Sequence, residues 1–321
     1  MLLRSAISLA LVLALNSAAL GEKRCNGVAA QVGDEKRCLK PKDSFKDCSN
    51  CPEMVVVPAG SFTMGSPAGE PGRYDDEGPQ HKVTIAKPFA VGRIAITRGE
   101  FATFVRETNH ATGDKCWTFE DGKSEERTSR SFHNPGFAQD DQHPVVCVNW
   151  DDAKAFATWL SNKTGKIYRL LSEAEREYAT RAGSTTRYTF GNVEKSLCRY
   201  GNVADQTAKR SIKGAEKWTI ADCDDGYAYT APVGKFTANA FGIHDVHGNV
   251  WDWTEDCWHD NYQGAPTNAS AWTSGDCSKR VIRGSSWFGY PRYLRSAGRF
   301  WRVAVDRSHY LGFRLARTLN P

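Results

Sequence analysis

The sequence predicts a loop-rich α+β fold with little regular secondary structure. Hydrophobic periodicity is confined to a few short stretches, and Gly, Asn, Asp and Trp, including ten tryptophans, are scattered along the chain. The hydrophobic fraction of 40% is ordinary for a globular protein, so a real core can form. Once an export segment is removed, roughly 300 residues remain, which fits one large domain with a short lead.

Three helices can be located from their start signals. Thr97 is followed three residues later by Glu100, which is the spacing of a capping box, and Ser172 has a glutamate at the same spacing. Asp151 is expected to open the remaining helix. Gly183 is expected to end the helix that Ser172 begins.

The first residues have the layout of a secretory signal. Arg4 gives the start a positive charge, residues 6–15 are mostly apolar, and residues 16–21 are small and polar. We place cleavage after Gly21, with Ala19 as the alternative. Since the apolar run is shorter than the ~18 residues that span a bilayer, we expect a secreted or periplasmic protein without a membrane span.

The sequence predicts three parts. We expect residues 1–21 to be the signal peptide, residues 22–53 to form a polar lead segment that bears cysteines, and residues 54–319 to form the main domain. The main domain opens with two strand-like runs, residues 54–58 and 61–64, separated by a turn.

Ten cysteines follow the signal, and an even number in an oxidising compartment predicts disulfides. The CxxC spacing of Cys48 and Cys51 could also indicate a redox motif or half of a zinc site. We give these alternatives little weight, because no βαβ pattern surrounds the pair and no second CxxC follows.

Charge is distributed unevenly towards the end of the chain. Residues 279–321 hold ten Lys and Arg but only one acid, Asp306, whereas residues 222–260 are mostly acidic. We expect these two segments to neutralise each other within one fold. No nucleic-acid partner is expected, because the arginines are interleaved with core-like aromatic residues.

Ordered motifs along the chain resemble the formylglycine-generating enzyme, or sulfatase-modifying factor, family. Residues 242–254 (GIHDVHGNVWDWT) are close to that family's most recognisable element, "G.YD..GNVWEW". The other similar stretches are residues 57–66 (VPAGSFTMGS), 144–153 (PVVCVNWDDA), 168–178 (YRLLSEAEREY), 280–287 (RVIRGSSW) and 311–314 (LGFR). The resemblance covers residues 54–316 and implies a C-type-lectin-like core that begins with an opening strand pair.

The family's enzyme oxidises a sulfatase cysteine to formylglycine with a cysteine pair that holds Cu(I), just after a "GGS" turn. Paired thiolates are soft ligands that suit Cu(I). Here the corresponding residues 284–299 contain no cysteine, and none follows Cys277. We therefore expect no copper site and assign no catalytic residue.

Relatives in this family carry out two other kinds of chemistry. Ergothioneine-type relatives carry an HxxxHxE iron motif, which this sequence lacks; the HxxH of His244 and His247 is interpreted as packing. Exported relatives of the pyoverdine-maturation type oxidise or remodel a siderophore precursor, and this activity stays open as an alternative.

The resemblance implies two calcium sites built from side-chain and carbonyl oxygens, the ligands that calcium prefers. The first would use Asn202, the carbonyl of Val203, Asp225 and the carbonyl of Tyr227. The second would use Asp245, the carbonyls of Gly248 and Val250, and Asp252. The alternative interpretation is that Asp245 and Asp252 only cap turns.

Closeness in sequence together with the resemblance predicts the disulfides of the main domain. They are Cys116–Cys147, Cys198–Cys223 and Cys257–Cys277. The lead cysteines Cys25, Cys38, Cys48 and Cys51 are expected to pair among themselves, in an order that the sequence leaves open.

The stretch between the "GSSW" turn and "LGFR" is the candidate recognition site. Tyr, Trp and Arg are typical of recognition surfaces, and in some exported relatives this stretch is a diversified binding face. We expect Trp287 and Arg314 to be structural, and residues 288–290, 300–302 and 308–310 to be exposed. The predicted ligand-binding face consists of Phe288, Tyr290, Arg292, Trp301 and Tyr310.

Two functions therefore remain. We favour a calcium-binding, non-catalytic binding or accessory module for a protein or small-molecule ligand. The alternative is an oxidoreductase that works without the usual cysteines, either on sulfatases or on a siderophore precursor.

Overall fold

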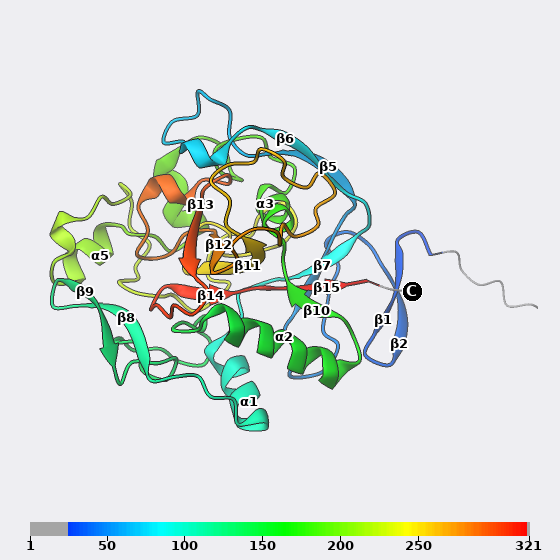
Figure 1. The fold of residues 1–321 in the computed structure, drawn as a ribbon, viewed down its shortest axis with the longest axis horizontal. Coiled ribbons are helices and arrows are strands. Elements are labelled where there is room, and N and C mark those ends of the chain that lie inside the picture. Colours follow the sequence, from blue (N-terminus) through cyan, green and yellow to red (C-terminus); the bar gives the residue numbers. More distant parts are fainter. Residues whose placement is uncertain (1–24, 320–321) are drawn as a thin grey trace, which may run out of the picture.

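The computed structural model of the protein describes residues 25–319. The predicted signal peptide at residues 1–21 lies outside this range. Short helices, short strands and long connecting loops alternate along the chain (Figure 1), which confirms the predicted α+β class. Among the described residues, none of the helices has the length and apolar character needed to cross a membrane.

A five-stranded antiparallel sheet forms one half of the core. Its order is β10-β15-β7-β4-β3, so the last strand of the chain lies between two earlier ones. The strands are β3 (Ser44–Phe45), β4 (Met54–Val57), β7 (Phe89–Gly92), β10 (Tyr168–Leu170) and β15 (Leu315–Thr318). Every residue of β4 is buried, which explains its continuous apolar sequence.

A four-stranded sheet in the order β13-β12-β11-β14 carries the C-terminal motifs. Its strands are β11 (Trp251–Cys257), β12 (Lys279–Arg283), β13 (Arg299–Val303) and β14 (Leu311–Phe313). Strands β11 and β14 are parallel, and the other pairs are antiparallel. In the aromatic and arginine-rich stretch, β13 is therefore separated from the "GNVWDW" strand β11 by β12 alone.

Three two-stranded hairpins complete the strands. They are β1–β2 (Val28–Val32, Glu35–Leu39), β5–β6 (Gly60–Met64, His81–Ile85) and β8–β9 (Lys115–Glu120, Lys123–Thr128). Hairpins β1–β2 and β8–β9 lie at opposite ends of the molecule (Figure 1). The implied opening strand pair is wrong as a pairing, because β4 joins the five-stranded sheet while β5 pairs with β6.

The three predicted helices are present. Helix α1 (Arg98–Thr108) has the expected capping box of Thr97 and Glu100, and α3 (Glu173–Arg181) begins at Ser172 and ends just before Gly183. Helix α2 (Trp150–Thr164) starts one residue earlier than expected, because the Asn149 side chain accepts the amide of Asp152. The shorter helices are α4 (Leu197–Tyr200), α5 (Gln206–Ser211), η1 (Asp75–Glu77), η2 (Glu194–Ser196), η3 (Ala215–Lys217) and η4 (Pro291–Leu294).

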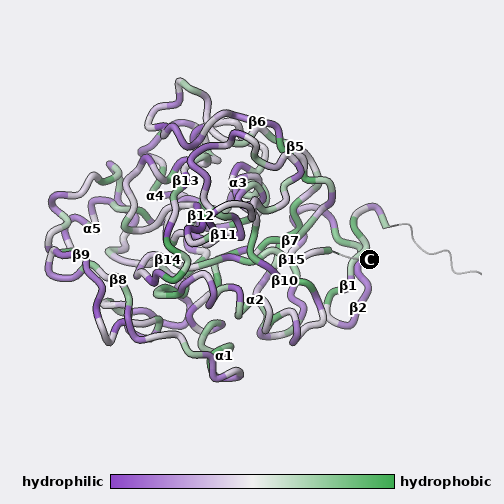
Figure 2. The backbone as a smooth tube through the Cα atoms, in the orientation of Figure 1, coloured by the Kyte–Doolittle hydropathy of each residue, from purple (hydrophilic) through white to green (hydrophobic). Residues whose placement is uncertain are grey.

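The main hydrophobic core lies between the two sheets and helices α1 and α2. The rings of Phe101, Phe156 and Phe313 pack together at its centre, with the Phe156 and Phe313 centroids 5.4 Å apart. Hydrophobic residues mark buried strands such as β7 and β14 (Figure 2). Leu39 and Phe45 of the lead segment belong to this core, so the lead packs onto the domain.

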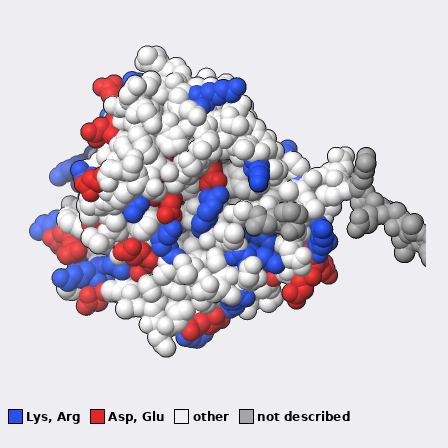
Figure 3. Space-filling view, turned by 45° about the vertical axis from the view of Figure 1, so that its right-hand side comes forward, with Lys and Arg blue, Asp and Glu red and all other residues white. Residues whose placement is uncertain are grey.

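Buried arginines join the C-terminal stretch to the rest of the fold. Arg283 and Arg299 form ion pairs with Glu177 and Glu173 of α3, and all four side chains are almost fully buried. The expected neutralisation by residues 222–260 holds for Arg314, which pairs with Asp252, but not for Arg283 and Arg299, whose carboxylates come from α3. On the surface, positive and negative side chains are interspersed on the face shown in Figure 3.

All ten cysteines lie within the described residues and form five disulfides. The lead cysteines pair as Cys25–Cys38 and Cys48–Cys51, which settles the order that the sequence left open. The domain pairs are Cys116–Cys147, Cys198–Cys223 and Cys257–Cys277, as expected. This many disulfides fits a periplasmic or extracellular protein.

Candidate functional site

An aromatic cavity opens beside the turn that carries the "GSSW" motif. Its volume is about 220 Å³. The lining residues are Trp218, Trp251, Ile282, Ser286, Phe288, Gly289, Tyr290, Tyr293, Phe300, Arg302 and Tyr310. They come from the residue after η3, the strands β11, β12 and β13, the turn after β12, η4 and the residue before β14, so several distant segments build one pocket.

The turn after β12 is shaped by close packing. Gly284 and Ser285 both have positive φ angles, of 95° and 61°. A Cβ atom on Gly289 would lie 2.0 Å from the Ser285 Oγ, so any other residue there would force the Ser285 side chain to move. The Trp287 side chain is buried, and its Nε1 donates to the carbonyl of His309 at 3.2 Å. The expected structural role of Trp287 agrees with this geometry.

Strand β13 presents alternate side chains to the cavity. Phe300 and Arg302 line it, whereas Trp301 lies on the other face of the strand, where the Lys279 ammonium sits 4.2 Å from its ring. Side chains of neighbouring strand residues point to opposite faces, so these three residues cannot share one surface. Trp301, which the sequence analysis assigned to the ligand-binding face, therefore does not line this cavity.

Two aromatic residues and an arginine form one wall. The rings of Phe288 and Tyr310 stack at a centroid distance of 5.7 Å with an interplanar angle of 4°. The Arg302 guanidinium donates to the Tyr310 hydroxyl and lies 5.3 Å from the Phe300 ring centroid. This wall offers flat apolar surface together with a fixed hydrogen-bonding group.

The predicted ligand-binding face is only partly assembled at the cavity. Phe288, Tyr290 and Tyr310 line it, but Arg292 instead covers the Tyr74 ring at 4.5 Å. Residues 308–310, expected to be exposed, are buried, because β14 and the loop before it pack against strand β8. The sequence analysis missed Trp218, Trp251, Ile282 and Ser286; Gly289, Tyr293, Phe300 and Arg302 belong to the predicted recognition stretch but were not assigned to its ligand-binding face.

The described residues of the cavity wall lack an activated nucleophile. The Ser286 Oγ accepts a hydrogen bond from the Phe288 amide at 3.3 Å, with no histidine partner. His309 lies behind the wall against Trp287 and Phe288, and burial lowers its pKa to about 3, so the imidazole is neutral near pH 7. The arrangement is suited to binding a flat molecule by contact and hydrogen bonding.

Both aspartates of the second implied calcium site are buried, and Asp252 lies in strand β11. The Asp245 Oδ2 accepts the Gly234 amide at 2.7 Å, and the Asp252 Oδ2 accepts Arg176 Nε at 2.8 Å. The Oδ1 atoms of both aspartates are buried and have no hydrogen-bond partner within residues 25–319. Burial raises the pKa of the Asp245 carboxyl. Two orphaned carboxylate oxygens are the kind of donors that calcium takes.

The first implied calcium site also comes together. The Asp225 carboxylate accepts the amides of Val203 and Tyr227, each at 2.8 Å, and Asn202 Oδ1 is buried without a partner in the described part of the chain. Asp205 lies beside Asp225, and the sequence analysis missed it. Burial and then the Asp205 charge raise the pKa of the Asp225 carboxyl to about 7.

The family follows from comparison with known proteins. Residues 40–319 match the family model of the sulfatase-modifying factor enzyme 1-like domain. The chain belongs to this family. It is 31% identical to the formylglycine-generating enzyme of Thermomonospora curvata, over 82% of this chain and 92% of that protein.

Two further members of the sulfatase-modifying factor family bear on whether this chain is catalytic. The chain is 30% identical to the inactive C-alpha-formylglycine-generating enzyme 2 of Bos taurus, over 82% of this chain and 87% of that protein. Its fold is similar to PvdO from Pseudomonas aeruginosa, with 43% identity and a TM-score of 0.74, over 88% of this chain and 100% of that chain. Family membership alone therefore does not decide whether this chain is catalytic; its own site residues must.

Proposed function

We propose that this chain is an exported, calcium-stabilised binding module of the sulfatase-modifying factor family that takes a small planar ligand in its aromatic cavity. The observation that carries the proposal is the cavity beside the "GSSW" turn, where Phe288 and Tyr310 form a flat wall and no thiol is present. Aromatic rings with a few placed polar groups are typical of ligand sites.

We expect no thiol chemistry at this cavity, because the cysteines form disulfides. All ten cysteines are paired, and the nearest residues after Gly284 are serine, tryptophan, phenylalanine and glycine. None of these side chains forms a thiolate that could engage Cu(I) or a substrate cysteine. A role in formylglycine generation would need a different donor set.

Calcium is proposed as a structural ligand at the two sites described above. What supports it is that Asn202, Asp245 and Asp252 each leave a buried oxygen without a partner. Burying such atoms unsatisfied is costly, and a bound cation would remove that cost. When bound, calcium would stabilise the folded turn; it takes no part in the proposed ligand contacts.

Two assays on the purified mature protein test the proposal. Titration with N-acetyl-tyrosinamide should quench tryptophan fluorescence saturably, because Trp218 and Trp251 line the cavity. Incubation with copper and a cysteine-containing sulfatase peptide should leave the peptide cysteine unchanged by mass spectrometry. Conversion to formylglycine would overturn the non-catalytic proposal, and no binding of any planar probe would overturn the proposed ligand class.

Oxidation of a siderophore precursor is the second candidate function. It is favoured by the shape of the cavity, because a planar conjugated ring would stack on Phe288 and bond to the Tyr310 hydroxyl. Such an oxidation would pass two electrons and two protons from the precursor to dioxygen, giving hydrogen peroxide. Peroxide release and a changed absorption spectrum with a catechol-containing peptide would support this candidate over simple binding.

A further inference from the structure

A second, polar cavity adjoins the aromatic cavity. Its volume is about 260 Å³. It is lined by Trp117, Ser124, Arg302, Asp306, Ser308 and Tyr310. Arg302 and Tyr310 line both cavities and are hydrogen-bonded to each other, so this pair forms a shared wall. The two cavities therefore lie on either side of the same two residues.

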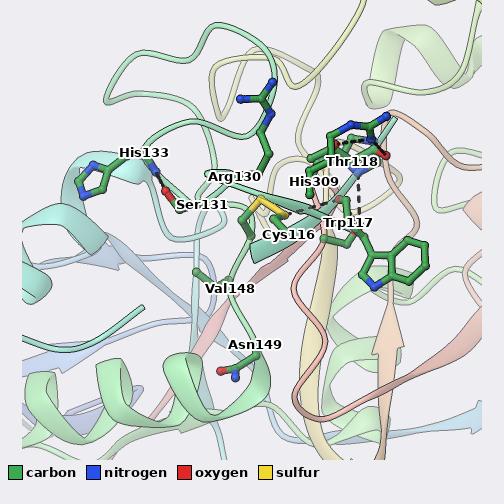
Figure 4. Close-up of a disulfide and its surroundings, with 12 residues drawn as sticks. Cys116, Trp117, Thr118, Arg130, Ser131, His133, Val148, Asn149 and His309 are labelled. Atoms are coloured by element: carbon green, nitrogen blue, oxygen red, sulfur yellow. Dashed lines mark hydrogen bonds between the residues drawn. A yellow bond between two sulfur atoms is a disulfide. The ribbon is translucent and has the colours of Figure 1, made fainter. Parts of the chain in front are cut away.

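The polar cavity is firmly built. Strand β8 is tied to the loop after β13, because the Trp117 amide donates to Arg307 O at 2.9 Å and the His309 amide donates to Trp117 O at 3.0 Å. The Cys116–Cys147 disulfide lies directly behind this strand (Figure 4), and the Cys147 amide donates to Ser308 O at 3.0 Å. A disulfide and three backbone hydrogen bonds therefore fix the Trp117 side of the cavity.

The acidic group of this cavity is the half-buried carboxylate of Asp306. No cationic side chain of residues 25–319 lies within ion-pairing distance of it. Its pKa is raised, chiefly by burial and also by Glu126, while Arg302 and the Val303 amide act in the opposite direction. A carboxylate without a partner in a partly desolvated cavity favours a cationic ligand group.

The remaining wall suits the same ligand chemistry. The Trp117 side chain is 43% exposed, and Glu126 lies opposite Trp117 in the β8–β9 register. An exposed indole ring attracts ammonium and guanidinium groups, and two nearby carboxylates add to that attraction. Arg302 also lines the cavity and keeps its positive charge, because the Tyr310 hydroxyl to which it donates carries none, so the carboxylates of Asp306 and Glu126 must together outweigh it.

We propose that the polar cavity is a second subsite, which binds an ammonium or guanidinium group attached to the planar group held in the aromatic cavity. The ligand class is then an aromatic molecule with a basic arm, such as a peptide in which lysine or arginine neighbours an aromatic residue. This inference rests on the proposed function, because it requires a planar group in the aromatic cavity.

Three blocked dipeptides test the inference on the mature protein. Tyrosine–lysine, tyrosine–glutamine and tyrosine–glutamate share the aromatic anchor and differ only in the charge of the arm. The lysine peptide should bind about fivefold more tightly than the glutamine peptide, and the glutamate peptide most weakly. The preference should shrink at high salt, since part of it is electrostatic.

Variants assign the preference to the polar cavity. Asp306→Asn should bring the lysine and glutamine peptides to nearly equal affinity, whereas Asp34→Asn, in the β1–β2 turn at the far end of the molecule, should leave the preference unchanged. Trp117→Leu, which alters an exposed side chain, should weaken the lysine peptide more than the glutamine peptide.

The outcomes separate this inference from the proposed function. If all three peptides bind equally, the second subsite is overturned while the aromatic cavity stands. If the lysine preference survives Asp306→Asn, the assignment to this cavity is also overturned. If no tyrosine peptide binds to the wild-type chain, the proposed function fails and the subsite fails with it.

Discussion

Arg295 and Glu77 form a buried ion pair between residues that lie 218 positions apart in the sequence. The Arg295 Nη1 and Glu77 Oε2 atoms are 2.7 Å apart, and both side chains are fully excluded from solvent. Arg295 directly follows η4, which carries the cavity residue Tyr293, and Glu77 closes η1. The pair therefore fixes one side of the aromatic cavity to a loop from the start of the domain.

Replacing Arg295 with Met should destabilise the protein strongly. The change leaves the carboxylates of Glu77 and Glu70 buried without their partner, because Arg295 also bonds Glu70 at 2.7 Å. Breaking a buried pair in this way costs about 3–5 kcal/mol. Urea denaturation followed by tryptophan fluorescence measures the change in unfolding free energy.

The matched control is the exposed Arg73–Asp75 pair in the same loop. Its nitrogen and oxygen atoms are 3.2 Å apart, but the Asp75 side chain is fully solvated. Asp75→Asn should therefore change the unfolding free energy by less than about 1 kcal/mol. Similar losses for Arg295→Met and Asp75→Asn would show that burial of the first pair does not set its contribution.

The ion pairs of Arg295 and Arg299 also show where prediction from the sequence stops. Helices α1 and α3 were located because a capping box lies within four residues of sequence and can be read directly. The partners of Arg295 and Arg299 could not be read, since residues some 126 to 218 positions away supply the carboxylates. Local signals specify elements, whereas ion-pair partners depend on the tertiary fold.

Some residues of the candidate site could likewise be predicted from the sequence, and others could not. Motifs placed Phe288 and Tyr310 in the right region, because the "GSSW" turn and the "LGFR" strand have recognisable sequences. The face of β13 could not be assigned, because a register shift of one residue exchanges Phe300 and Trp301 and only the pairing with β12 fixes it. Trp218 was missed because η3 has no sequence motif that links it to β13.

Calcium should raise the melting temperature of the wild-type protein, and Asp245→Asn should reduce that gain. A ligand present at about 100 times its Kd stabilises the folded state by about 2.7 kcal/mol, or roughly 5 °C or more for a domain of this size. Asn keeps an oxygen for the Gly234 amide but loses the carboxylate charge. Thermal unfolding with calcium and with a chelator measures the difference.

The choice of variant matters at this site. Asp252→Ala would also leave Arg176 and Arg314 without their shared carboxylate, so it would destabilise the chain with or without calcium. Asp222→Asn, which affects only an exposed pair with Lys195, serves as the control and should keep the full calcium gain. An unchanged melting temperature after chelation of the wild-type protein would count against both calcium sites.

Acid should destabilise the protein in part through His309. Burial lowers the pKa of His309 to about 3 in the folded chain, below the ordinary value of 6.5, so only the unfolded chain takes up the proton between these values. The unfolding free energy is therefore unaffected by His309 above pH 6.5 and falls as the pH is lowered from 6.5 towards 3. By pH 5 the loss amounts to about 2 kcal/mol.

The variant His309→Phe isolates this contribution from that of other groups. Phenylalanine fits the aromatic surroundings of Trp287 and Phe288 and cannot be protonated. Urea denaturation at pH 7 and pH 5 should show a smaller loss of unfolding free energy for His309→Phe than for the wild type. Equal losses for the two proteins would contradict the assignment to His309.

Of two neighbouring residues in β13, only one should affect ligand binding. Phe300 lines the aromatic cavity, whereas Trp301 packs under Lys279 on the other face, so Phe300→Leu should weaken binding of N-acetyl-tyrosinamide and Trp301→Leu should not. Loss of one aromatic contact corresponds to about 0.5–1.5 kcal/mol, or roughly a three- to tenfold rise in Kd. Isothermal titration calorimetry measures this without depending on tryptophan fluorescence. Equal weakening by both variants would mean that the ligand does not use the cavity face of β13, and that the binding site lies elsewhere.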